Sequence, residues 1–123
     1  MRVIEAKTFS GCGGLQQTEL AKPQPVKDRV LVRVTAAGVT PLDHTLSGGH
    51  PRAKAPPVLG NEGAGVVEDA GESGLAVGSR VMFTGPYGVG ENCAWQDWLL
   101  VRPEHSALAP DAIDWRPIGE RNQ

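Results

Sequence analysis

Glycine and proline interrupt this chain at short intervals, and that spacing limits its fold more than any other feature. The 123 residues include 16 glycines and 10 prolines. Between these breakers, apolar and polar residues alternate with the period of a β-strand, so short strands and many turns are expected. Because 40% of the residues are hydrophobic, a chain of this length can still bury a core as one domain. We therefore expect a single, loop-rich, mainly β domain.

The strongest strand pattern is RVLVRVTAA at residues 29–37, in which Val30, Val32 and Val34 would share one face and Leu31 would lie on the other. Further strands are expected at residues 1–8, 15–23, 63–71, 79–85 and 94–102, with a short strand or extended piece at 105–110. About seven short strands joined by Gly/Pro turns predict a β-barrel or a β-sandwich.

One segment, TPLDHTLSGG at residues 40–49, carries helix signals instead. Thr40 is placed as the N-cap, Pro41 as the first helical residue, and Gly48 or Gly49 as the stop. We expect one or two helical turns here. Asp43 is expected to be a structural acceptor that braces this turn.

Charge and hydropathy argue against several classes of function. The net charge is −2 and the basic residues are scattered, whereas a nucleic-acid ligand needs a concentrated basic face. The chain has no apolar run long enough to span a membrane and no apolar signal at its N-terminus, so we expect a cytoplasmic protein without a membrane partner. Cys12 and Cys93 form no CxxC pair, which indicates reduced thiols.

The side chains that could do chemistry gather between residues 36 and 65. His44 could donate a proton near pH 7, or it could simply face solvent on its helix. Glu62 lies among glycines, where the backbone can approach a ligand, or its carboxylate could bond nearby amides. For Thr40 the alternative to a pocket role is helix capping, and for Thr45 it is an ordinary place on the helix face. The whole set is Thr40, Asp43, His44, Thr45, Asn61 and Glu62.

Two motifs in this region, AAGVTPLD at 36–43 and GNEGAGVVE at 60–68, are followed by VGSRVMF and a late LLVRP. In this order they resemble the N-terminal GroES-like domain of the medium-chain dehydrogenase/reductase superfamily, and most of all its zinc-free quinone oxidoreductases and enoyl reductases. The resemblance covers residues 1–113 and implies a mainly β, GroES-like, partly open β-barrel with one or two short helices. Residues 114–123 would be a frayed tail.

The resemblance also implies that no metal is bound. Zinc-dependent members have Cys at the position of Thr40 and His at the position of Asn61. Thr and Asn are poor ligands for zinc, and Glu62 alone cannot hold the ion. The four-cysteine lobe that holds structural zinc in those relatives is missing, and only Cys93 lies near that region.

In the zinc-free quinone oxidoreductases, Asn commonly stands at the position of Thr40 and Tyr at that of Thr45, and both side chains line the nicotinamide and substrate pocket. Both are threonine here, so the phenol is lost, and Tyr87, the only tyrosine, could reach the cleft from another loop. Thr40, with Tyr87 or His44, would hydrogen-bond the developing oxyanion. We thus expect catalytic roles for Thr40, His44 and Tyr87, substrate binding by Thr45, Asn61 and Glu62, and structural support from Asp43.

The reaction of such enzymes needs a second, doubly wound domain whose G-x-G-x-x-G turn holds NADPH. SGCGG at 10–14 is not that fingerprint, because no helix is expected after it. We therefore expect this chain alone to bind no cofactor and to be inactive, with NADPH needed by a full-length enzyme.

The expected partners are a small carbonyl or quinone substrate, and either the missing Rossmann domain or a second copy, in a symmetric dimer, on the uncovered flank. The alternative function is a stand-alone, non-catalytic module for small-ligand binding or assembly.

Overall fold

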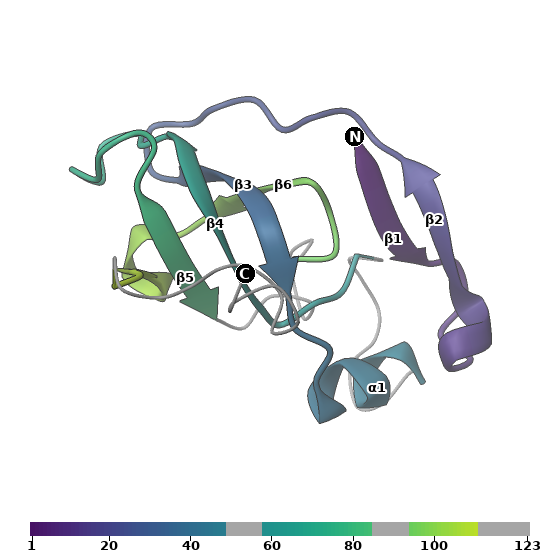
Figure 1. Cartoon of the computed structure of the whole chain (residues 1–123). Helices are drawn as coiled ribbons and strands as arrows, with labels where there is room; N and C mark the ends of the chain where they lie inside the picture. Colours follow the sequence, from purple (N-terminus) through teal and green to yellow (C-terminus); the bar gives the residue numbers. More distant parts are fainter. Residues whose placement is uncertain (49–57, 85–93, 111–123) are drawn as a thin grey trace, which may run out of the picture.

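A computed structural model describes residues 1–48, 58–84 and 94–110 (Figure 1). The strands in these ranges form two antiparallel sheets, one with the order β1-β2 and one with the order β6-β3-β4-β5-β7. The prediction of a mainly β domain with a short helix is confirmed, and neither sheet closes into a full barrel. The elements are β1 (Arg2–Ala6), η1 (Cys12–Gly14), β2 (Leu15–Glu19), β3 (Val30–Ala37), α1 (Pro41–Ser47), β4 (Glu62–Asp69), β5 (Arg80–Thr84), β6 (Trp98–Val101), η2 (Pro103–His105) and β7 (Ser106–Leu108).

The main core lies against the five-stranded sheet. Alternation places the buried residues as predicted on β5, where Val81 and Phe83 are buried and Met82 is exposed. On β3, Leu31 is only 1% exposed although it was assigned to the face opposite Val30. Both faces of β3 are therefore covered where the strand begins. The core consists of Val30, Val32, Val67, Val81, Phe83, Ala94, Leu99 and Val101.

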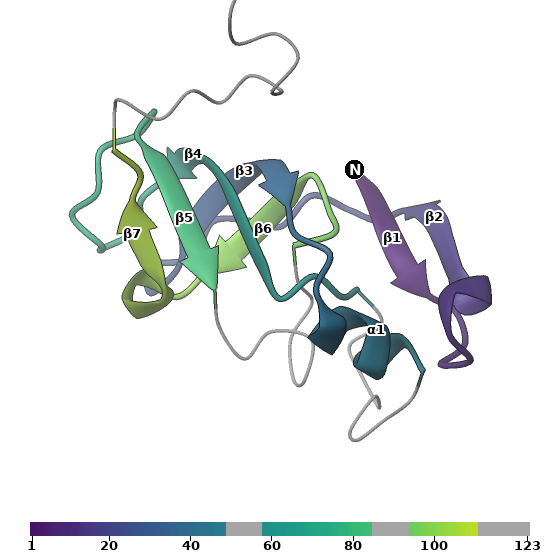
Figure 2. The same ribbon diagram turned by 60° about the horizontal axis from the view of Figure 1, so that its bottom comes forward.

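Residues 94–97 join the two sheets. Ile4 N donates to the carbonyl oxygen of Trp95 at 2.8 Å, and Asp97 N donates to that of Arg2 at 3.1 Å. The prediction of one strand over 94–102 is therefore wrong at its start: β6 begins at Trp98, because the preceding residues pair with β1 instead. The two views in Figures 1 and 2 show β1 and β2 beside the larger sheet, with α1 below both.

Other boundaries also differ from the prediction. The strand expected over residues 15–23 ends at Glu19, well before Pro23. The loop expected at 50–57, the GPYGVGEN loop and the tail at 114–123 lie outside the described residues. Among the described residues, no helix has the length and apolar character that a membrane crossing requires.

Candidate functional site

The helix α1 begins where the sequence predicts, and its first turn is closed by two residues that bond each other. Thr40 Oγ1 accepts a hydrogen bond from Asp43 N at 3.3 Å. In return, Asp43 Oδ2 accepts from Thr40 N at 2.9 Å and from the Thr40 hydroxyl at 3.0 Å. This reciprocal arrangement is a capping box, and it satisfies backbone donors that a helix N-terminus leaves open.

The Asp43 carboxylate also reaches the entry of β4. Its Oδ1 accepts from Asn61 N at 3.0 Å, and the residue is completely buried. A buried carboxylate is tolerated only when hydrogen bonds replace its lost hydration, and here three donors do so. We call Thr40, Asp43 and Asn61 the carboxylate hub. Asn61 takes part through its backbone amide, which any non-proline residue would supply.

Trp95 holds the two loops that flank the hub. Its Nε1 donates to the carbonyl oxygen of Gly38 at 3.0 Å. Gly60 has φ +104°, and a Cβ at this position would lie 2.5 Å from Trp95 Cδ1. Only glycine combines that backbone conformation with so close an approach to the indole. Trp95 was not singled out in the sequence.

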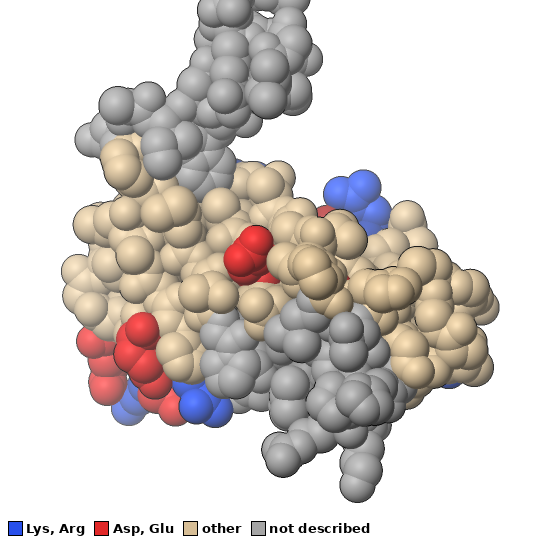
Figure 3. Space-filling model, turned by 90° about the horizontal axis from the view of Figure 1, so that it is seen from below, with Lys and Arg blue, Asp and Glu red and all other residues tan. Residues whose placement is uncertain are grey.

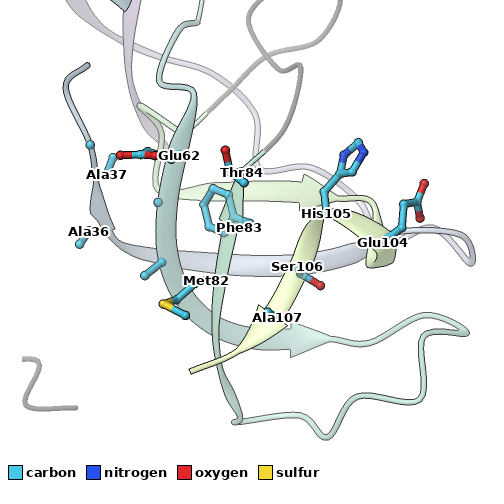
Figure 4. A pocket seen from close by; sticks show the side chains of 13 residues that line it. Ala36, Ala37, Glu62, Met82, Phe83, Thr84, Glu104, His105, Ser106 and Ala107 are labelled. Atoms are coloured by element: carbon cyan, nitrogen blue, oxygen red, sulfur yellow. The ribbon is translucent and has the colours of Figure 1, made fainter. Parts of the chain in front are cut away.

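Beside the hub, four segments enclose a groove of about 840 Å³ (Figure 4). They are residues 36–38 at the end of β3, 62–64 at the start of β4, 82–84 at the end of β5, and 104–107 from η2 into β7. Figure 4 shows Glu62 on one side of the groove and Glu104 with His105 on the other. A volume of this size, with a mainly apolar lining and a few polar groups, is typical of small-molecule sites.

The predicted site residues divide between the hub and the groove. Thr40, Asp43 and Asn61 meet in the hub, while Glu62 is exposed and lines the groove. His44 is exposed on α1. Thr45 lies in α1, but its side chain is not among those described, and Tyr87 lies outside the described residues.

Several groove residues carry no sequence signal. None of the four polar residues Thr84, Glu104, His105 and Ser106 was singled out in the sequence. Each comes from a segment that looks ordinary by itself, and the segments meet only through the pairing of β3, β4, β5 and β7. Glycines in GNEGAGVVE were the one available hint, because they allow close approach to a ligand.

The donor set of the hub does not fit zinc. The Thr40 hydroxyl is committed to Asp43, and neither a hydroxyl nor a carboxamide matches the thiolate and imidazole ligands that zinc prefers. Within the described ranges, no three His, Cys, Asp or Glu side chains form a group that could hold a metal ion.

The glycine turn at 10–14 does not fit the pyrophosphate of NADPH. The glycines at 11–14 lead through the short turn η1 into the strand β2. A dinucleotide site needs a helix N-terminus after such a glycine turn, because its backbone amides and dipole hold the phosphates.

Residues 26–109 match the family described as the alcohol dehydrogenase GroES-like domain. An acryloyl-coenzyme A reductase from Sulfurisphaera tokodaii is 38% identical over 85 residues, which are 65% of this chain and 25% of that protein.

Solved structures of oxidoreductases also superpose on this chain. A probable oxidoreductase from Mycobacterium abscessus superposes with a TM-score of 0.82 at 33% identity, covering 93% of this chain and 36% of the other. A quinone oxidoreductase from Pseudomonas syringae pv. Tomato DC3000 does so with a TM-score of 0.79 at 27% identity, covering 92% and 34%. The chain thus spans only a part, about a quarter to a third, of the proteins it matches.

Proposed function

Because this chain belongs to the alcohol dehydrogenase GroES-like domain family, we propose that it is the substrate-binding part of a zinc-independent, NADPH-dependent quinone or enone oxidoreductase. The open apolar groove beside the carboxylate hub carries this proposal. The similarity to a quinone oxidoreductase and to an acryloyl-coenzyme A reductase supports a conjugated carbonyl compound as the substrate class.

In this proposal, the chain binds and orients the carbonyl compound in the groove and leaves the hydride source to the rest of a full-length enzyme. A hydrogen-bond donor aimed at the substrate oxygen would stabilise the negative charge that develops there. Thr40 can serve only by exchanging its Asp43 partner, because its one hydroxyl proton is already donated. His44, exposed on α1, and Tyr87 are the other candidate donors.

Zinc independence rests on the hub. The positions that would carry cysteine and histidine in a zinc enzyme are Thr40 and Asn61, and both are tied to Asp43. A metal that took the Thr40 hydroxyl as a ligand would have to displace Asp43 from it, and the Asn61 carboxamide would be a weak ligand. We therefore expect activity that survives chelation.

A chimera tests this function. Residues 1–113 of this chain would replace the matching part of the Pseudomonas syringae quinone oxidoreductase, and NADPH oxidation would be followed with a quinone and with an enone, with and without a zinc chelator. We expect the chimera to oxidise NADPH, and we expect the chelator to leave the rate unchanged. A chimera that binds NADPH but reduces neither compound would contradict the proposed activity, and loss of turnover on chelation would contradict zinc independence.

The matched control is a chimera with Ala107→Trp, which places an indole in the groove and should lose most of its turnover. The isolated chain should bind no NADPH in a fluorescence titration. Tight binding there would show that a cofactor site exists in this chain after all.

Two exposed apolar residues flank the groove and suggest how it is covered. Val39, 82% exposed, follows the groove residue Gly38, and Leu108, 59% exposed, follows Ala107. A partner that contacts both would close the groove without filling it. We propose that the cofactor domain, or a second copy of the chain, covers this flank. Sedimentation velocity on the isolated chain should show dimers at tens of micromolar, and a strict monomer would count against the second copy.

A further inference from the structure

The charged side chains that line the groove are mainly acidic. Of the described residues that line it, the ionisable ones are Glu62, Glu104 and His105, and none is lysine or arginine. Glu62 and Glu104 are both exposed, and no ion pair joins either of them to another described residue. Figure 3, which views the molecule from below, shows one acidic patch within a broad uncharged face, with other charged side chains at its margins.

We propose that Glu62 and Glu104 make the groove selective for uncharged ring compounds and exclude anionic ones of the same shape. The inference deepens the proposed function and rests on it for the substrate class. Within that class it separates neutral quinones and enones from compounds that carry a carboxylate, a sulfonate or a phosphate near the ring.

Charge and shape together support this choice of ligand. The lining between the two acidic sides is formed by small or apolar side chains such as Ala64, Met82 and Phe83, which favour the flat faces of a ring. Figure 4 shows the two carboxylates on opposite sides of the lining, so an anion in the groove has a carboxylate toward either side. A unit charge near a single solvated carboxylate is repelled enough to weaken binding about fivefold.

His105 is the one lining group that could attract an anion. It stands beside Glu104 in Figure 4, and its imidazole carries positive charge only when protonated. The measurement is therefore made at pH 8, above the ordinary pKa of a histidine side chain.

The test uses the complete chain and two probes that share one ring system, 2-acetylnaphthalene and 2-naphthoate. The ketone and the carboxylate are similar in size, and neither reacts with the exposed Cys12 thiol. Binding is followed by amide chemical shifts in NMR at low salt. We expect the ketone to shift amides in the four lining segments and to bind at least about fivefold more tightly than the carboxylate.

Two kinds of variant locate the effect. The double variant Glu62→Gln, Glu104→Gln should bring the two affinities to within about twofold, since the repulsion is removed while the shape is kept. Ala107→Trp should abolish ketone binding by filling the groove. Ala76→Trp, on an exposed turn outside the groove, is the matched control and should leave it unchanged.

Even if a variant does not fold, the salt dependence of probe binding to the unmodified chain tests the proposed repulsion. Added salt should narrow the gap between ketone and carboxylate, because solvent-exposed charges are screened. The proposal is overturned if both probes bind equally well at low salt, or if neither binds. It also fails if raising the protein concentration prevents the ketone from shifting the groove amides, because a second copy would then fill the groove itself.

These outcomes are independent of hydride transfer. A chimera that reduces quinones while the isolated chain shows no preference would leave the proposed function standing and remove the charge selection. The opposite pattern would leave a selective binding groove and remove the reductase assignment.

Discussion

The carboxylate hub and the groove meet in one stretch of chain, residues 36–64, yet they are held in opposite ways. In the hub, one completely buried carboxylate accepts three hydrogen bonds from two segments. In the groove, the backbones of the lining strands are paired, but the side chains of Glu62 and Ala107 are exposed. A satisfied buried network resists substitution, whereas an exposed surface tolerates it. The chain thus combines a fixed frame with a surface that can change its ligand.

The largest expected effect tests the hub directly. Asp43→Ala leaves three buried or half-buried donors without their acceptor, so we expect it to lower the free energy of unfolding by about 3 kcal/mol. Urea unfolding followed by tryptophan fluorescence measures this. Asp69→Ala is the control, because that carboxylate accepts a single exposed bond from Gly71 N. Equal effects of the two variants would show that the hub is no more than an ordinary surface turn.

The second test asks whether the loop beside the hub is held by its packing on Trp95. Gly60→Ala should cost about 2 kcal/mol, from a strained positive φ together with a contact of 2.5 Å to the indole. Gly74→Ala has φ +80° but no neighbour within 4 Å of the added Cβ, so it reports the backbone strain alone. The difference between their unfolding free energies isolates the contact. No difference would mean that the indole simply moves aside.

A third and smaller effect concerns acid. A hydrogen bond from Lys22, and then one from Trp98, lowers the pKa of Glu68, and a hydrogen bond from Arg2 lowers the pKa of Asp97. A lowered folded-state pKa adds stability above the unfolded value of about 4 and loses it as the pH falls through the folded value. These pairs are exposed, so each should contribute under about 1 kcal/mol.

The measurement is the unfolding free energy between pH 6 and pH 3, with Glu68→Gln, Asp97→Asn as the comparison. The double variant should lose less stability on acidification than the unmodified chain. Identical pH profiles would show that neither ion pair contributes.

The smallest effect is expected in the groove. Glu62→Gln should change the free energy of unfolding by less than about 0.5 kcal/mol, since the side chain is exposed and outside the core. Thermal unfolding at pH 7 measures this change, and Asp43→Ala is measured in the same way for comparison. A loss as large as that of Asp43→Ala would remove the distinction between frame and surface.

The helix cap in the hub could be predicted from the sequence because it depends on residues that are close together in the chain. Thr40, Pro41 and Asp43 stand at the spacing of a capped helix start, and α1 begins there. The third contact was not foreseeable in the same way. Asn61 supplies a backbone amide from the entry of β4, which no side-chain pattern announces.

The groove could not be predicted from any one segment. Thr84 and Ser106 look like ordinary strand residues, and they line the same groove as Glu62 only because β4 pairs with β5 and β5 pairs with β7. The same holds for residues 94–97, which were expected to belong to one strand with 98–102 but form backbone hydrogen bonds with several segments, β1 among them.

By itself, the sequence determined the strand and helix segments, the helix cap and the family motifs, because these depend on residues close together in the chain. Only the tertiary structure decided that Asp43 is buried against Asn61, that Leu31 is covered, and which residues border the groove. The physical reason is that burial and charge at a site are set by what distant segments bring to it. Local sequence patterns do not specify which distant segments come together.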